Sequence, residues 1–136
     1  AMTGYPILCN LTVPHRKQYL VKNRNSNQVN VQILLEIMAE LTDTNVLSRT
    51  NKKELQWLQT EAKNILEAGG AFCESGMENV RKLNRICIHK NISPGGAADL
   101  LAATIFLCRM ENLMERLQRE DAACGIVSKE QVWYTM

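Results

Sequence analysis

Apolar residues in this chain recur at spacings of three and four, the period of an amphipathic helix. Such stripes cover residues 29–41, 52–68, 75–90 and 94–119. No stretch shows the strict alternation of apolar and polar residues that is typical of a half-buried strand. We therefore predict an all-α, compact, bundle-like domain of about five to six helices, because helices with one apolar face bury it against one another.

The segments between the stripes predict connectors. Residues 3–14 hold two prolines and no helical period, which indicates an extended lead-in, and a short helix is expected from about residue 15 to residue 22. Residues 23–27 are Asn, Arg and Ser, and Asn and Ser bond their own backbone and interrupt helices. Residues 43–49 are expected to form a polar turn or loop between two helices.

Local residues also predict where the helices begin and end. Thr50 or Asn51 can cap the helix over residues 52–68, and the pair Gly69-Gly70 can end it, because glycine adopts left-handed backbone without steric cost. Ser75 is expected to cap the next helix. Ser93 is a suitable cap for the longest helix, with Pro94 at the first helical position, where its missing N–H costs nothing.

These boundaries divide the chain into a helical domain over residues 3–119 and a C-terminal tail over residues 120–136. Within the tail, Gly125 marks a break, Ser128 can cap a last short helix, and residues 132–134 are apolar or aromatic and can dock back on the body.

Composition and charge narrow the class of protein. Aromatic residues make up only 5% of the chain, which suits packed helices better than a sheet sandwich. The net charge is +2, and a small basic group near the N-terminus has no interleaved aromatic residues, so we expect no nucleic-acid partner. No apolar run reaches the roughly 18 residues of a membrane span. Five scattered cysteines without a Cys-x-x-Cys pair indicate reduced thiols and a cytoplasmic protein.

Gly95-Gly96 is an unusual pair for the first turn of a long helix, where each glycine costs up to about 1 kcal/mol relative to alanine. One interpretation is a phosphate site, since a helix start offers unpaired N–H groups and glycine permits close approach. Asp99, one turn further on, could then orient a metal-bound water or a ribose hydroxyl. The other interpretation is close helix packing, with Asp99 complementing the helix dipole. The motif alone leaves both open.

Residues 43–49 form a second candidate site. Asp43 could hold Mg²⁺ through oxygen, and Arg49 could bind a phosphate with two parallel hydrogen bonds. The alternative is an ordinary turn in which Asp43 caps a helix and Arg49 is paired on the surface. Taken by itself, the segment favours this simpler interpretation.

Several segments together resemble one enzyme family, triphosphoribosyl-dephospho-coenzyme-A synthase, over roughly residues 4–110. The resemblance is to the C-terminal half of that family. The matching segments are Gly4-Tyr5-Pro6, Pro14-His15, Asp43-Thr44-Asn45-Val46 with Ser48-Arg49, Leu55-Gln56-Trp57-Leu58-Gln59 with Glu61-Ala62, Gly69-Gly70, and Asn91-Ile92-Ser93-Pro94-Gly95-Gly96-Ala97-Ala98-Asp99-Leu100-Leu101. Two positions depart from the family pattern: Thr42 stands where the family usually has glycine, and Ala97 where it usually has serine.

The resemblance implies an all-helical transferase of citrate or malonate metabolism. It would join ATP to 3′-dephospho-coenzyme A, release adenine, and form the precursor of an acyl carrier protein's prosthetic group. It also implies the residues of the nucleotide site. The substrate-binding residues would be Asn45, Ser48, Arg49, Ser93, Gly95 and Gly96, and Asp43 and Asp99 would lie near a Mg²⁺ ion.

The resemblance also implies a missing part. The family's N-terminal half carries a Lys-Pro-Gly segment and an Asn-Thr-His-Lys-Gly segment, and neither occurs in this sequence. We therefore expect activity to require an N-terminal synthase half, a separate subunit or a second copy of the chain. The alternative is a non-catalytic helical module that binds a nucleotide or oligomerises. The sequence identifies no catalytic acid or base.

Overall fold

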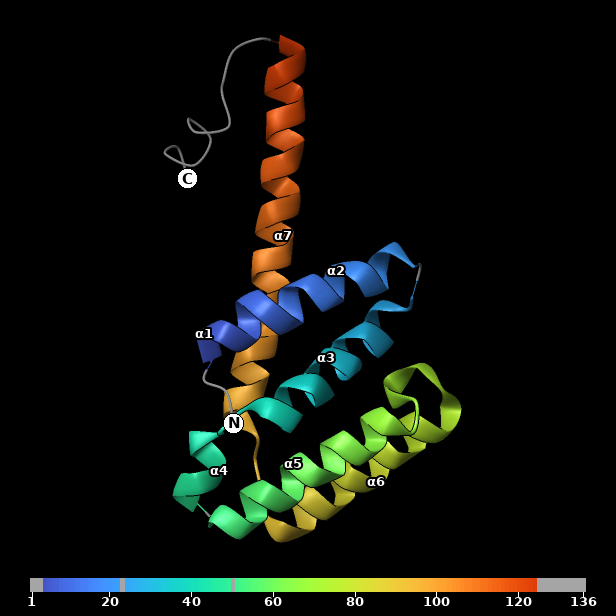
Figure 1. Cartoon of the computed structure of the whole chain (residues 1–136), viewed down its shortest axis with the longest axis vertical. Coiled ribbons are helices and arrows are strands. Elements are labelled where there is room, and N and C mark those ends of the chain that lie inside the picture. The colour runs from blue at the N-terminus through green and yellow to red at the C-terminus, as the bar shows by residue number, and fades with distance from the viewer. Residues whose placement is uncertain (1–3, 23, 50, 125–136) are drawn as a thin grey trace.

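The computed structural model describes residues 4–22, 24–49 and 51–124, and it is all-α (Figure 1). No β-strand occurs within these ranges, which confirms the predicted fold class. The elements are α1 (Gly4–Ile7), the π-helical turn η1 (Leu8–Thr12), α2 (Val13–Val21), α3 (Ser26–Glu40), α4 (Thr44–Arg49), α5 (Lys52–Glu67), the 3₁₀ turn η2 (Gly70–Phe72), α6 (Glu74–Lys90) and α7 (Gly95–Cys124). None of the described helices is both long and apolar enough to cross a membrane.

Helix α3 lies at the centre of the body. It packs against α5 below it, α2 above it and the first part of α7 beside it (Figure 1). Val29, Ile33 and Ile37 are each fully buried. Burying one such side chain stabilises the fold by roughly 1.5–3 kcal/mol, so these three residues make α3 a substantial part of the core.

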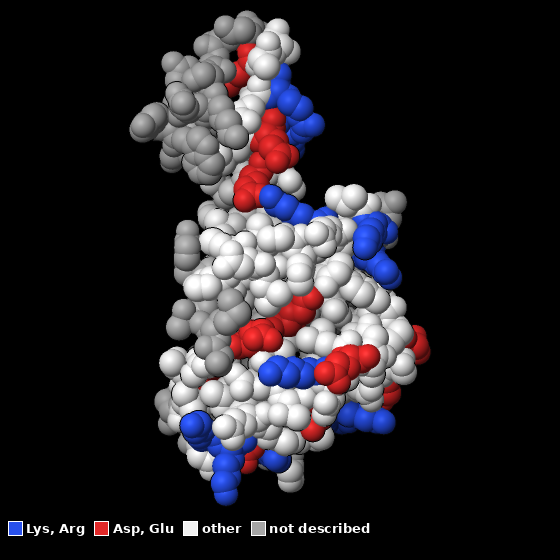
Figure 2. Space-filling model, in the orientation of Figure 1, with Lys and Arg blue, Asp and Glu red and all other residues white. Residues whose placement is uncertain are grey.

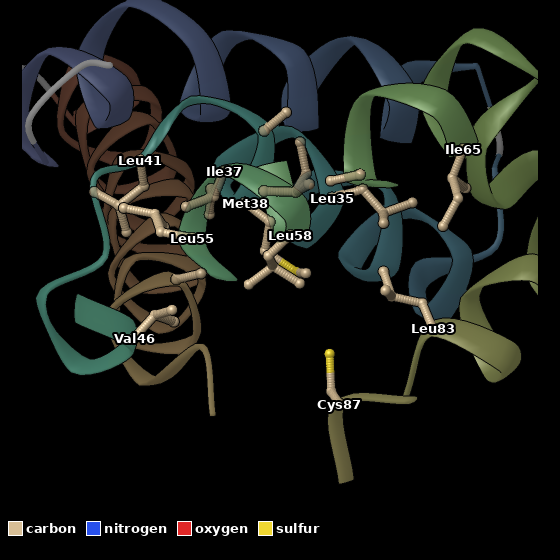
Figure 3. Close-up of a cluster of buried hydrophobic side chains, with 14 of the residues drawn as sticks. Leu35, Ile37, Met38, Leu41, Val46, Leu55, Leu58, Ile65, Leu83 and Cys87 are labelled. Atoms are coloured by element: carbon tan, nitrogen blue, oxygen red, sulfur yellow. The ribbon is translucent and has the colours of Figure 1, made fainter. Parts of the chain in front are cut away.

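The core between α3, α5 and α6 is aliphatic (Figure 3). Leu35 and Met38 of α3 lie close to Leu58 of α5, while Leu83 and Cys87 approach from α6. The stripe predicted for residues 52–68 is therefore the buried face of α5, and the stripe predicted for residues 75–90 supplies the contacts of α6.

Several predicted helix ends are confirmed. The side chain of Asn51 accepts a hydrogen bond from the N–H of Glu54 at 3.0 Å, so Asn51 rather than Thr50 is the cap of α5. Gly69 and Gly70 have φ angles of 117° and 65°, the left-handed conformation expected of a terminal glycine pair.

The extended lead-in predicted for residues 3–14 is wrong, because the chain is helical from Gly4 onward. Pro6 lies in the first turn of α1 and Pro14 in the first turn of α2, where a missing N–H is tolerated. Between them, the N–H of Val13 bonds to the carbonyl of Leu8, five residues back. This π turn lets the helical path continue up to the second proline.

Tertiary contacts explain why this segment is helical without a clear period. Ile7 and Thr12 are fully buried, and the Thr12 hydroxyl lies 2.8 Å from the hydroxyl of Thr104 in α7. Lys17 of α2 also pairs with Glu111 of α7. The segment is therefore held against α7 by contacts that its own sequence does not reveal.

The cap predicted at Ser75 is also wrong. The thiol of Cys73 accepts a hydrogen bond from the N–H of Gly76 at 3.3 Å, and α6 already begins at Glu74. Hydrogen bonds from the Ser75 hydroxyl and from this N–H lower the pKa of the Cys73 thiol. Sulfur in the place of a capping oxygen is the reason why the pattern of usual cap residues failed here.

Helix α7 differs from its prediction at both ends. It begins at Gly95, and the carbonyl of Pro94 accepts the first helical hydrogen bond from Ala98, so Pro94 stands at the cap position predicted for Ser93. It continues to Cys124 rather than to about residue 119. Leu113 and Leu117 belong to the apolar stripe predicted over residues 94–119, but they are exposed, because α7 continues beyond the body (Figure 1). Met114, of the same stripe, is buried as predicted. The short helix and docking predicted for residues 125–136 fall outside the described residues.

Candidate functional site

The two predicted site segments meet at Asp43. Helix α3 ends at Glu40, and the chain then turns into α4, which packs against α7. The side-chain amide of Gln59 in α5 donates to the carbonyl oxygen of Leu41 at 2.8 Å and fixes this turn. Residues 43–49, which we predicted as a loop, are thus mostly the short helix α4. Asp43, the residue immediately before α4, is only 3% exposed.

The Asp43 carboxylate binds backbone N–H groups from two helix starts. Its Oδ1 accepts from the N–H of Val46 in α4 at 3.4 Å and from the N–H of Gly96 in α7 at 3.3 Å. Its Oδ2 accepts from the N–H of Ala97 at 3.1 Å. The first N–H groups of a helix have no partner within the helix, and a carboxylate is stabilised by the positive end of the helix dipole. Asp43 therefore caps α4 locally and α7 across 53 residues of sequence.

Gly96 is explained by the same contact. A Cβ atom at this position would lie 2.9 Å from Oδ1 of Asp43 and 3.1 Å from its Cγ. Both distances are shorter than ordinary van der Waals contact, so a side chain at residue 96 would push the carboxylate away from the helix start. Of the two interpretations of the Gly95-Gly96 pair, close packing accounts for Gly96.

The remaining predicted residues lie on these two elements. Asn45, Ser48 and Arg49 belong to α4, and Ser93 precedes α7 and is exposed. Asp99 is an exposed residue of α7, one turn after Gly95. The fold thus brings the backbone of both predicted segments to one end of the body.

The carboxylates here offer limited support for a metal ion. In the described part of the chain, no group of three or more His, Cys, Asp or Glu residues could hold one. Mg²⁺ in nucleotide sites commonly takes only one or two carboxylates, with the remaining positions filled by water and phosphate. Asp99 fits that role because it is exposed, whereas Asp43 is buried with its oxygens directed at backbone N–H groups.

Sequence reasoning missed a second polar cluster, in which α2 meets α3. Glu36 is 9% exposed, and its Oε1 accepts from the Tyr19 hydroxyl at 2.6 Å and lies 3.1 Å from Nδ1 of His15. Burial and the neighbouring Glu36 carboxylate raise the pKa of Tyr19 to about 12. A glutamate among apolar residues of α3, with a histidine and a tyrosine at spacing four in the preceding helix, was the available signal.

One hollow lies beside Glu36, and another lies near the start of α7. A groove of about 580 Å³ is bordered by Glu36, Glu40, Lys63 and Glu67. A second hollow of about 420 Å³ lies between α3 and α6, has mainly apolar walls, and ends at Ser93 and Pro94. This second one is of the size and character of a small-molecule site, and it adjoins the start of α7.

The geometry defines an all-α domain in which a buried carboxylate joins two helix starts beside an apolar hollow. Residues 1–118 match the CitG family, ATP:dephospho-CoA triphosphoribosyl transferase. The chain therefore belongs to this family, which confirms the resemblance noted from the Asp43 and Ser93 segments. No solved structure matches the chain.

Proposed function

We propose that this chain is the C-terminal portion of a triphosphoribosyl-dephospho-CoA synthase. The reaction joins ATP to 3′-dephospho-CoA: the ribose 2′-hydroxyl of dephospho-CoA bonds to C1 of the ATP ribose, the bond from that carbon to adenine breaks, and the hydroxyl proton leaves with adenine or a base. The observation that carries the proposal is the family match over residues 1–118.

The Asp43 junction supports the proposed position of the polyphosphate. Because the carboxylate already accepts the N–H groups of Gly96 and Ala97, a phosphate does not bind directly on them. Asp43 instead holds α4 against the start of α7. We propose that the phosphates lie beside this junction, bound by Asn45, Ser48 and Arg49 from α4 and by the Ser93–Gly95 segment.

Mg²⁺ in this proposal arrives with the nucleotide. It would neutralise phosphate charge, and Asp99 would be the carboxylate that contacts it directly or through water. Asp43 would act through the backbone that it positions, in place of the direct ligation that the sequence first suggested for both residues.

We further propose that an N-terminal synthase half completes the site. Among the described residues, His15 is bound to Glu36 and not to the Asp43 junction. The ion-paired lysines Lys17 and Lys90 bind Glu111 and Glu54. The Lys-Pro-Gly and Asn-Thr-His-Lys-Gly segments of the family would supply phosphate-binding and proton-transfer groups from that half.

Adenine release tests the proposal. The chain is incubated with ATP, 3′-dephospho-CoA and Mg²⁺, alone and with a co-expressed N-terminal half of a family synthase, and adenine is separated by liquid chromatography. We expect release only with both parts, and a decrease of at least about tenfold for Arg49→Ala, the effect of losing one bidentate phosphate contact. Lys53→Ala, at an exposed residue of α5, is the matched control.

Calorimetry separates this function from the alternative of a non-catalytic module. Heat of binding for ATP or dephospho-CoA without adenine release, in the presence of the N-terminal half, would favour a nucleotide-binding module. No heat with either nucleotide and no release would contradict the transferase proposal for this chain.

A further inference from the structure

Glu36 has one carboxylate oxygen that the fold leaves without a hydrogen bond. Its Oε1 accepts from the Tyr19 hydroxyl at 2.6 Å and lies 3.1 Å from Nδ1 of His15. Its Oε2 is buried and has no hydrogen-bond partner among the described residues. Glu36 as a whole is only 9% exposed. Buried polar atoms almost always have a partner, so this oxygen indicates a donor that binds there from outside the chain.

The groove of about 580 Å³ is the space that borders this carboxylate. Its walls come from η1, α3 and α5, and Glu36 is one of its lining residues. The volume lies within the range of small-molecule sites. A ligand in the groove is therefore next to the unpaired oxygen.

The charges of the groove favour a cation. Glu36, Glu40 and Glu67 are acidic and Lys63 is basic, which leaves the lining with two net negative charges, whereas the whole chain has a net charge of +2. Figure 2 shows acidic side chains on either side of a basic one over the middle of the body, where α3 and α5 lie (Figure 1). A cleft lined mainly by one sign of charge concentrates ions of the opposite sign.

The spacing of the carboxylates favours an organic amine over a metal ion. In the part of the chain that the structure describes, no group of three or more His, Cys, Asp or Glu residues could hold a metal ion. Glu36 and Glu40 lie one turn apart on α3, a rise of about 6 Å, which suits two separate positive charges. An ammonium group has only donors, as an unpaired acceptor requires. Leu11 and Leu66 line the same groove and offer apolar surface to methylene groups.

From these observations we infer that the groove binds an aliphatic polyamine. One ammonium group donates to Oε2 of Glu36, a second lies beside Glu40, and the methylene chain between them contacts Leu11 and Leu66. This site is independent of the proposed transferase function, because none of the residues proposed to bind the nucleotide lines the groove.

Isothermal titration calorimetry of the full chain with spermidine tests the site. We expect saturable binding at one site, and no binding of a neutral diol of the same chain length. Glu36→Gln should raise the dissociation constant at least about tenfold, because it removes the charged acceptor of an ammonium group while keeping an oxygen for Tyr19. Glu120→Gln removes the same charge from an exposed residue near the end of α7 and should leave the dissociation constant within about twofold.

A second pair of variants tests the groove without changing Glu36. Asn10 lines the groove and is exposed, so Asn10→Lys places a competing ammonium group there and should raise the dissociation constant at least about fivefold. Asn112→Lys adds the same charge at an exposed residue of α7 and should change it by no more than about twofold. Circular dichroism checks that each variant is folded, and if Glu36→Gln is not, this pair decides.

Three results would overturn the inference. A natural chain that gives no saturable heat with spermidine at millimolar concentrations has no such site. A diol that binds as tightly as spermidine shows that the groove does not recognise positive charge. A folded Glu36→Gln or Asn10→Lys variant with the natural affinity for spermidine places the amine elsewhere on the chain.

Discussion

Replacing Asp43 with alanine removes the cap from two helices at once. Three N–H groups, those of Val46, Gly96 and Ala97, lose their carboxylate acceptor. Loss of an N-cap costs about 1 kcal/mol, and each buried donor left without an acceptor costs roughly 1 kcal/mol or more. Gly96 is partly exposed, so water can replace part of the lost bonding, and we expect the free energy of unfolding to decrease by about 3 kcal/mol.

Two further variants calibrate this prediction. Asp43→Asn keeps one acceptor oxygen but turns an amide N–H₂ toward the other donors, and a loss of about 1–2 kcal/mol is expected. Asp99→Ala removes an exposed carboxylate from the same part of α7 and should change stability by no more than about 0.5 kcal/mol. Urea unfolding followed by circular dichroism gives all three values, provided that the dependence of the free energy of unfolding on urea concentration is the same for each variant.

The result decides what Asp43 does. If Asp43→Ala is as stable as Asp99→Ala, the carboxylate does not hold α4 to α7 and the capping argument is refuted. If instead Asp43→Ala unfolds early while Asp99→Ala folds normally but binds Mg²⁺-ATP more weakly in the presence of an N-terminal half, the two carboxylates have the separate roles proposed above.

Three other predictions follow from the described contacts. Tyr19→Phe should lower the free energy of unfolding by about 1 kcal/mol below pH 10, and the difference should vanish as the pH rises through 12, because only the neutral phenol donates to Glu36 and the pKa of Tyr19 is raised to about 12. Urea titrations of both proteins across this range measure the difference, and a difference that persists at the highest pH contradicts the prediction. Gly76→Ala should lower the free energy of unfolding by more than about 3 kcal/mol, since the new Cβ would lie 1.7 Å from the carbonyl oxygen of Gly70. The melting temperature measures this loss, and a value close to that of the natural chain would show that the turn adapts easily. Cys73, whose pKa is lowered, should react with iodoacetamide at neutral pH before Cys87, whose pKa is raised by burial; peptide mass spectrometry gives the order, and equal rates would count against the two environments.

The helices of the body were predictable because their signals are local. The stripe over residues 29–41 identified α3, and Asn51 and the Gly69-Gly70 pair marked the ends of α5, because capping and glycine conformation depend only on near neighbours. The same local reasoning failed for residues 3–14. There, two prolines hid a helix that is stabilised by its burial against α7.

The segments that form the candidate site were predictable from the sequence, but their geometry was not. Motifs that resemble the family identified the segments around Asp43 and Ser93, and the family match over residues 1–118 agrees with that prediction. The bond between Asp43 and the start of α7 joins residues 53 and 54 positions apart, and no local pattern specifies such a contact. Glu36 and its partners His15 and Tyr19 were missed for the same reason.

The sequence by itself determined the all-α class, the main helices and the family, since periodicity, caps and motifs are properties of short segments. Only the tertiary structure decided the function of Gly96, which is to let a buried carboxylate approach a helix start. It also decided which apolar residues of α7 are buried. Within the single stripe predicted over residues 94–119, Thr104 and Cys108 are buried against the body, whereas Leu113 and Leu117 are exposed, because the body does not extend along the whole of α7.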